Sequence, residues 1–368
     1  MTTNLDGHPN SGRLVSLDAY RGLTMLLMAS YGFGMWQLLG KSEWVASHPL
    51  WAEFARQFNH PVWEGCTLWD LIFPSFLFVI GVAMPHSYEK RAEQGQSWPR
   101  QLVHAAWRGA VIFAIGVFLD SYHGGQLQLN FPVVLHKIGV CYVLAFLVLR
   151  FSPRVQLGIA GVLLVGHSLA YALYGDPETR WAVDQNVGHY VQHNWLHLEV
   201  RNGNTVMNAV TGTVNVIFGI LCGRLLQSDR IMKQKLITMI VAGVATLVAG
   251  YALSYWIPIN KWLWTSSYTL WTGGFTFLIM AFFYGVVEML GYRRWTFPFV
   301  VVGMNSIMVY VFAGLFRDNI NRGARLFFDP TPLADMPIVG PIVLSSLVLG
   351  VIWLFAYWLF RHRVFIKV

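Results

Sequence analysis

Charged residues are scarce in this sequence. They make up 12% of its 368 residues, about half the share found in ordinary soluble domains. Apolar residues make up 55%, and the mean hydropathy is +0.48. This combination argues against a cytosolic enzyme and against a disordered chain, and it predicts a membrane protein. The net charge of +8 is spread along the chain and forms no single basic face, which argues against nucleic-acid binding.

Cysteine is also rare, and the sequence has no cysteine spacing typical of a metal site. Cys66, Cys141 and Cys222 stand far apart with no Cys-x-x-Cys spacing, so neither a zinc site nor a disulfide framework is predicted. Three histidines, at positions 189, 193 and 197, would share one face if that segment were helical. Because no carboxylate or cysteine lies among them, we predict no metal site.

Long apolar windows are what the sequence has in abundance. About 20 mostly apolar residues are needed to cross a bilayer as a helix. Ten such windows centre on residues 20–39, 68–85, 102–119, 133–149, 155–173, 206–225, 236–256, 268–290, 297–315 and 341–360. They predict an all-α integral membrane protein, a polytopic bundle of about ten transmembrane helices. We expect one domain over residues 13–368, a polar tail over 1–12, and a first helix that inserts without cleavage.

The distribution of Lys and Arg among the loops predicts the orientation. With the N-terminus in the cytoplasm, seventeen of the 26 basic residues fall on the inner side and eight on the outer side. Both termini are therefore expected to be cytoplasmic. The long segments 42–66, 120–132, 174–205 and 316–340 then face outward, and part of the chemistry should lie there.

Two charged residues three positions apart stand at the start of the first window. Asp18 and Arg21 lie on one helical face and can pair. In a functional interpretation, Arg21, or Arg13 beside it, faces an anionic ligand on the cytoplasmic side while Asp18 fixes its direction. A structural ion pair that closes the start of the helix is the alternative, and spacing alone favours it.

A second polar cluster precedes the second window. Thr67 is placed to cap a helix whose first turn contains Asp70, and capping alone explains that carboxylate. Pro61 favours an extended conformation at His60, which leads into the outer mouth of the bundle. If Asp70 orients the imidazole, His60 can take a proton from an incoming amine or hydroxyl. The alternative is that His60 is an ordinary loop histidine, one of twelve in the chain.

Other polar residues interrupt apolar runs. Asn and His within spans usually satisfy one another across helices, and Asp120 with Lys137 can form an outer ion pair. This is the favoured interpretation of His136, His167, Asn208, Asn215 and Asn305. The glycines at 32, 34, 273 and 274 are similarly expected to mark close helix packing.

Several blocks carry a family resemblance. They are Leu-Asp-x-x-Arg-Gly at 17–22, His-Pro-Val-Trp-Glu-Gly at 60–65, Thr-Leu-Trp-Asp-Leu-Ile-Phe-Pro at 67–74, Asn-Lys-x-Leu-Trp-x-x-Ser-Tyr at 260–268 and Gly-Met-Asn-Ser at 303–306. In this order they resemble the heparan-α-glucosaminide N-acetyltransferase family, including its bacterial members. The resemblance implies a membrane acyltransferase that moves an acetyl group from cytoplasmic acetyl-CoA to a sugar amine on the far side. It implies that His60 is catalytic and that Asp18 and Asp70 belong to the site.

The resemblance also implies roles for further residues, and the sequence departs from the family pattern at some of these positions. Arg13, Arg21, Ser30 and Lys137 are expected to bind the donor, and Asn260, Lys261, Trp264 and Asn305 the acceptor side; no metal is expected. Ser30 stands where the family usually has Asn, and His136-Lys137 where it usually has Gln-Arg, which keeps a cation but loses the bidentate fork. The expected acceptor is an amino sugar or envelope glycan, the expected location the inner membrane of a bacterium, and a homodimer is implied by the resemblance.

The sequence alone leaves other functions open. A proton-coupled transporter of a small solute would use the same buried Asp, Arg and His residues as a relay. A polysaccharide O-acyltransferase shares the opening Leu-Asp-x-x-Arg-Gly. The departures at Ser30 and Lys137 also permit an inactive relative that serves as a scaffold.

Overall fold

The computed structural model describes residues 14–35, 38, 42–129, 134–201, 203–336 and 338–366. Within these ranges the chain is helical, and its one β feature is an isolated bridge between Arg201 and Asn204. The all-α prediction is confirmed. The expected tail and Arg13 lie outside the described residues.

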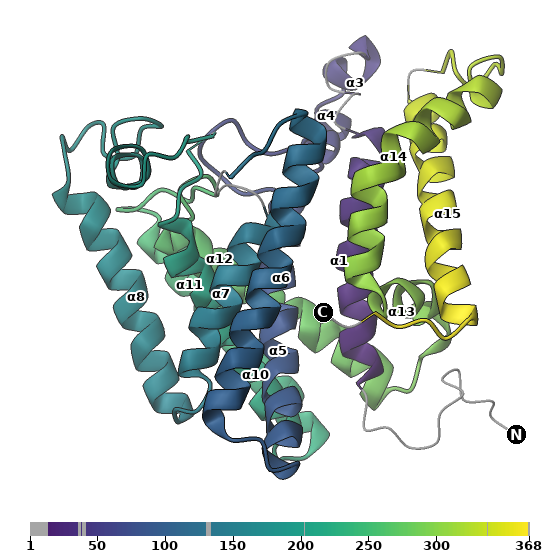
Figure 1. Ribbon diagram of the computed structural model, residues 1–368. Helices are drawn as coiled ribbons and strands as arrows, with labels where there is room; N and C mark the ends of the chain where they lie inside the picture. Colours follow the sequence, from purple (N-terminus) through teal and green to yellow (C-terminus); the bar gives the residue numbers. More distant parts are fainter. Residues whose placement is uncertain are drawn as a thin grey trace, which may run out of the picture.

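Long helices run roughly side by side, as Figure 1 shows. They are α1 (Val15–Ser30), α5 (Ile72–Glu93), α6 (Trp98–Gly124), α7 (Val134–Val148), α8 (Pro153–Leu173), α10 (Asn208–Gln227), α11 (Met232–Leu253), α12 (Ser266–Phe283), α14 (Ser306–Phe328) and α15 (Val339–Arg361). Shorter ones are α3 (Glu43–Ser47), α4 (Pro49–Arg56), α9 (Val187–Tyr190) and α13 (Phe297–Gly303). Helices α3 and α4 project from one end of the bundle.

Among the described residues, seven helices are long and apolar enough to span a bilayer. An eighth span results if α13 and α14, which meet at a bend of 70°, count as one. The remaining two predicted windows contain the shorter helices α1, of 16 residues, and α7, of 15. A polytopic membrane protein is therefore established, and the count of ten and the orientation of the termini stay predictions.

The first predicted helix is shifted toward the N-terminus. It begins at Val15 and ends at Ser30, whereas the apolar window continues to residue 39. The chain leaves the helix because Tyr31, Gly32 and Phe33 adopt left-handed backbone angles, with φ of 54°, 70° and 51°. The glycines of this turn therefore terminate a helix, and close packing is only part of their role.

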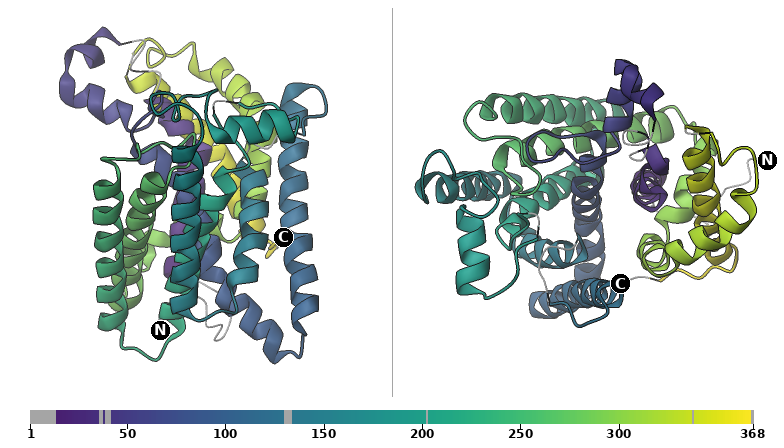
Figure 2. Two further views of the ribbon diagram at one scale, coloured as in Figure 1. Left: turned by 90° about the vertical axis from the view of Figure 1, so that its left-hand side faces the viewer. Right: turned by 90° about the horizontal axis from the view of Figure 1, so that it is seen from above.

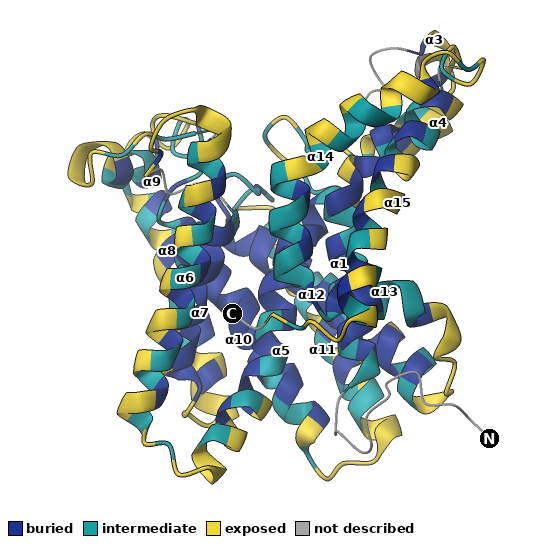
Figure 3. Ribbon diagram, turned by 45° about the vertical axis from the view of Figure 1, so that its right-hand side comes forward, coloured by how far each residue is buried: buried dark blue, intermediate teal, exposed yellow. Residues whose placement is uncertain are grey.

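Burial separates central helices from peripheral ones. The most apolar windows of α5 and α10 are 78% buried, whereas that of α11 is 17% buried. Figure 3 shows the buried positions gathered where helices face each other. Apolar side chains such as Val241, Val244 and Val248 are exposed on α11, as expected for a helix facing lipid.

Two groups of helices meet at α1. One contains α5 to α8 with α10 to α12, and the other contains α13 to α15; α1 packs on α13, α14 and α15 and also on α5 and α12. In the view from above in Figure 2 the two groups are largely separate, although α14 also touches α6, where a Cβ on Gly314 would lie 3.2 Å from a methyl group of Leu119. Gly22 and Gly303 let α1 and α13 cross closely, since a Cβ on Gly303 would lie 2.0 Å from the carbonyl oxygen of Asp18.

Candidate active site

His60 and Asp70 form a close pair near the end of α1. His60 Nδ1 lies 2.6 Å from Asp70 Oδ1. The Asp70 side chain is fully buried, whereas the His60 side chain is 32% exposed. With Nδ1 bonded to a carboxylate, the imidazole has a fixed orientation and a second nitrogen that can exchange a proton with a substrate. The predicted pairing is present in the structure.

The two carboxylate oxygens of Asp70 have different partners, one at the start of a helix and the other on His60. Its Oδ2 accepts hydrogen bonds from the backbone N–H of Thr67 at 3.0 Å and from the Thr67 hydroxyl at 3.1 Å. This capping box starts the short helix η2 (Leu68–Leu71), which continues into α5. Because Oδ1 is left for His60, the cap and the contact with the imidazole are both present in the structure. Tyr268 adds a hydrogen bond to the Asp70 carbonyl at 2.8 Å.

Lys261 completes the cluster from a distant part of the sequence. Its Nζ lies 3.2 Å from Asp70 Oδ1 and lies against both ring nitrogens of His60, 2.8 Å from Nδ1 and 2.9 Å from Nε2. The loop that carries Lys261 is tied to the His60 loop by a hydrogen bond from the Gly65 N–H to the Ile259 carbonyl, at 2.7 Å. A cation, an imidazole and a carboxylate thus meet at one place, from segments 201 residues apart.

The turn over residues 260–265 fixes Lys261. Asn260 Oδ1 accepts from the Leu263 N–H at 3.0 Å, and Thr265 Oγ1 accepts from the Asn260 N–H at 3.1 Å. Trp264 closes the turn with a left-handed φ of 50°. Asn260 and Trp264, which the sequence resemblance assigned to the acceptor side, are both buried here and shape the loop that carries Lys261.

Burial shapes the chemistry of two neighbours. It lowers the pKa of Lys261 from its ordinary value, and the Asp70 carboxylate opposes that shift. It raises the pKa of the Cys66 thiol, which keeps that group protonated. Cys66 is therefore a poor nucleophile, and His60 is the reactive candidate on this loop.

Lys137 lies behind this cluster. Its Nζ donates to Asn204 Oδ1 at 2.5 Å and stands over the rings of Trp264 and Phe73, 5.5 and 5.9 Å from their centroids. Trp264 in turn donates to Asn215 Oδ1 at 3.1 Å. The expected ion pair of Lys137 with Asp120 does not form, because Asp120 lies near Arg201, at 3.8 Å.

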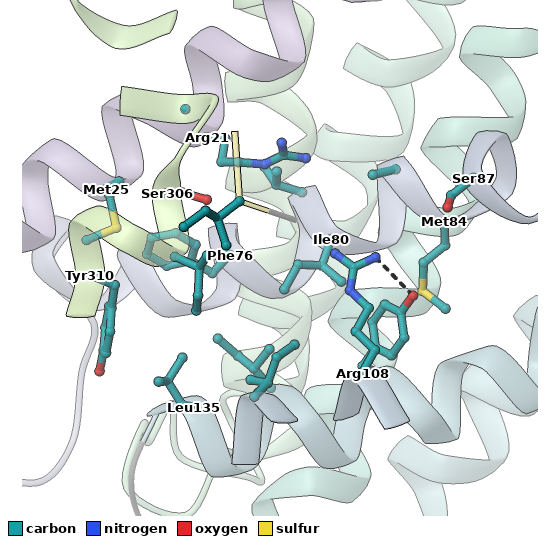
Figure 4. Close-up of a pocket in the computed structure, with 18 of the residues that line it drawn as sticks. Arg21, Met25, Phe76, Ile80, Met84, Ser87, Arg108, Leu135, Ser306 and Tyr310 are labelled. Atoms are coloured by element: carbon teal, nitrogen blue, oxygen red, sulfur yellow. Dashed lines mark hydrogen bonds between the residues drawn. The ribbon is translucent and has the colours of Figure 1, made fainter. Parts of the chain in front are cut away.

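A cavity of about 440 Å³ lies between the two groups of helices. Arg21 from α1 and Arg108 from α6 come from opposite walls, as the close-up in Figure 4 shows. Arg108 donates to the Tyr142 hydroxyl at 3.3 Å. Side chains that carry polar or charged groups in the wall are Arg21, His86, Ser87, Arg91, His104, Arg108, Tyr142, Ser306 and Tyr310. Most of the remaining lining is apolar, with four methionines at positions 25, 28, 84 and 304.

One face of η2 and α5 connects the cavity to the cluster. Asp70, Phe73 and Phe76 follow at steps of three residues; Phe76 lines the cavity, and Phe73 packs edge-on against Trp264 with centroids 4.7 Å apart. Six residues of helix correspond to about 9 Å. Phe76 therefore stands in the cavity wall, and Phe73 lies between it and Asp70 along the chain.

Asp18, Ser30 and Asn305, the other predicted site residues, each bond a different part of the structure. Asp18 pairs with Arg21 at 3.5 Å near the start of α1, so it belongs to the cavity end and is not brought together with His60. Ser30 bonds its own helix, donating to the Leu27 carbonyl at 2.7 Å, and is absent from the cavity wall. Asn305 stands at the bend between α13 and α14 and bonds the segment after α15.

Sequence reasoning did not select several cavity residues. Arg91 and Arg108 were counted only as inner-side charges, and His86 and His104 were not singled out. A signal existed, because all four lie on α5 or α6 near the expected inner ends of those helices. No group of three or more His, Cys, Asp or Glu residues in the described ranges is arranged to hold a metal ion.

Comparison with known proteins agrees with these motifs. The family model described as "Heparan-alpha-glucosaminide N-acetyltransferase, catalytic" matches residues 13–193. Heparan-alpha-glucosaminide N-acetyltransferase of Homo sapiens is 26% identical over 365 residues, and that of Mus musculus is 27% identical over 367. Over most of its length the chain is similar to the heparan-α-glucosaminide N-acetyltransferases.

The similarity includes residues of the cavity and residues of the cluster around His60. Alignment with the human and mouse heparan-α-glucosaminide N-acetyltransferases includes 81% and 82% of this chain and 52% and 53% of theirs, so the chain spans about half the length of these relatives. The matched family segment contains Arg21, His60 and Asp70. Lys261 lies beyond it, and the structure itself brings that residue to the pair.

Proposed function

We propose that this protein is a membrane-embedded acetyltransferase that moves an acetyl group from acetyl-CoA to an amino sugar. The observation that carries the proposal is the pairing of His60 with the buried Asp70 beside Lys261, together with a cavity beside helix α5 that has Arg21 and Arg108 in its wall. A relationship to glucosaminide N-acetyltransferases supports the same reaction class.

The cavity suits the donor in size and in chemistry. Ligand pockets commonly enclose about 300–1,000 Å³, and the cavity of about 440 Å³ falls in that range. Arg21, Arg91 and Arg108 can pair with phosphate groups, and the apolar lining can hold the pantetheine arm. Arg13, outside the described residues, remains a candidate for the same role.

Replacing Arg108 with Ala is expected to raise the KM for acetyl-CoA about tenfold with little change in kcat, because one charge-assisted contact to the donor is worth about 1.5–3 kcal/mol. Initial rates over a range of acetyl-CoA concentrations measure both constants. Arg100→Ala, an exposed change on the same helix outside the cavity wall, is the control. An unchanged KM in Arg108→Ala would place the donor elsewhere.

At the other end, His60 acts on the acceptor. The imidazole takes a proton from the sugar amine, the amine nitrogen attacks the thioester carbonyl carbon, the carbon–sulfur bond breaks, and the sulfur leaves and is protonated to the free thiol. Lys261 stabilises the negative charge that develops on the carbonyl oxygen. In the alternative route, the acetyl group first moves to His60 and then to the amine.

The charge of Lys261 gives the reaction an alkaline limit. Its pKa is lowered by burial, so the ammonium loses its proton at a lower pH than an ordinary lysine. We expect the transfer rate to fall there as pH rises. In Lys261→Arg the guanidinium keeps its charge, and the fall should move to higher pH or disappear. Rates measured from neutral to alkaline pH test this, and identical profiles would remove Lys261 from the chemistry.

The distribution of Lys and Arg among the loops is the basis for the orientation that we propose in the membrane. The excess of Lys and Arg in the expected inner loops supports an orientation with the Arg-lined cavity toward the cytoplasm and His60 toward the outer face. We propose the inner membrane of a bacterium, an envelope amino sugar or glycan as acceptor, and a homodimer. In this setting the pantetheine arm threads past Phe73 to reach His60.

Calorimetric binding of acetyl-CoA to the purified protein, followed by mass detection of acetylated amino sugars, tests the proposal. Binding with transfer supports it. An acetylated protein without acceptor, with the label on His60, would select the covalent route. Absence of binding would contradict the proposal, and flux of a solute into proteoliposomes without acyl-CoA would then support a transporter.

A further inference from the structure

The chain after α15 turns back toward the bundle. Arg363 has a left-handed φ of 54°, and the following residues Val364–Ile366, here called the strap, run between the two groups of helices, where the C mark lies in Figures 1 and 3. Asn305 holds the strap at two points. Its Nδ2 donates to the Val364 carbonyl at 2.9 Å, and its Oδ1 accepts from the Ile366 N–H at 3.2 Å.

The strap belongs to the wall of the cavity. Ile366 lines the cavity together with Gly303, Met304 and Ser306, the residues on either side of Asn305. Asn305 is itself 1% exposed, so its amide is fixed at the bend between α13 and α14. The side chain that latches the strap therefore stands on a rigid junction at the edge of the donor site.

The strap is lightly held apart from this latch. Ile366 is 42% exposed and Val364 37% exposed, so Phe365 between them, which is partly buried, is the one strap side chain whose apolar burial contributes appreciably. The backbone adds one hydrogen bond, from the Val364 N–H to the Leu359 carbonyl. A segment with few buried contacts opens at a low free-energy cost.

We propose that the strap is a movable wall of the donor site, latched by Asn305, which opens for the donor to bind and closes over its pantetheine arm. Asn305 is a positioning residue in this account and makes no contact with reacting atoms. The inference rests on the proposed function only in naming acyl-CoA as the ligand that the wall retains.

A labelling experiment tests the latch without any donor. Ile366→Cys is introduced with Cys66→Ser, since Cys141 and Cys222 are buried, and its reaction rate with a maleimide is measured. Adding Asn305→Ala is expected to raise the rate about tenfold. Asn305→Asp, which keeps the size but loses the donor to the Val364 carbonyl, should act alike; Asn319→Ala, exposed on the same helix, should have no effect. Equal rates in all variants would overturn the latch.

Donor binding tests the wall. Asn305→Ala and Ile366→Ala are each expected to raise the Kd for acetyl-CoA severalfold, and the double variant no more than the larger single effect, since both act through one contact. Saturating acetyl-CoA should slow labelling of Ile366→Cys. Additive effects on Kd, or labelling indifferent to acetyl-CoA, would overturn the wall. If the unaltered protein binds no acetyl-CoA, the proposed function fails, whereas the labelling of the Asn305 variants still decides the latch.

Discussion

His60→Ala is expected to lower the rate of acetyl transfer by about 10²–10⁴-fold, the usual contribution of a general base, while the Kd for acetyl-CoA stays unchanged. The separation follows from the structure, because His60 is absent from the wall of the Arg-lined cavity. Single-turnover rates and calorimetric binding on the same preparation measure the two quantities.

The control for this variant is His193→Ala, an exposed histidine outside the cluster, which should keep full activity. His60→Gln adds a second comparison because it retains polarity without a basic ring nitrogen. If His60→Ala lost donor binding or its helical structure, His60 would be a structural residue. If it kept its transfer rate, another group would be the base.

Asp70→Asn is expected to reduce kcat by about 10²–10⁴-fold, comparable to the loss of the general base itself. The amide cannot supply the negative charge that orients His60 Nδ1 and pairs with Lys261, both within 3.2 Å of Asp70 Oδ1. Its oxygen can still accept from Thr67, so the cap of η2 is retained in part. Steady-state rates and thermal unfolding are measured together.

Thr67→Ala separates capping from catalysis. It removes the hydroxyl that bonds Asp70 Oδ2 and should cost about 0.5–2 kcal/mol of stability, with kcat changed far less than in Asp70→Asn. If the two variants lost the same stability and the same small fraction of kcat, Asp70 would be a cap alone.

The part of the site that the sequence predicts is the part built from local contacts. Thr67, Asp70 and His60 lie within eleven residues, and cap spacing with a proline bend suffices to bring them together. The apolar windows likewise predict the helical class. The resemblance named Lys261, but its contact with His60 spans 201 residues, and spacing along the chain carries no information about such a pairing.

The features of the structure that the sequence did not predict have physical causes too. The first helix ends early because four consecutive residues, from Tyr31 to Gly34, take left-handed φ angles, which an apolar window does not report. Ser30 bonds its own helix, and Asn305 bonds the strap, two contacts that the sequence does not reveal. The cavity is lined by six helices, α1, α5, α6, α7, α13 and α14, and by Ile366, so its lining emerges only when they pack.

Transfer across a sealed membrane tests the central claim most directly. The protein is reconstituted in proteoliposomes, acetyl-CoA is supplied only on the side of the Arg-lined cavity, and an amino sugar that does not permeate is supplied only on the other side. The account predicts acetylated sugar on the acceptor side, with free CoA released on the donor side, and no product in His60→Ala. Product formed only when donor and acceptor share one side would contradict it.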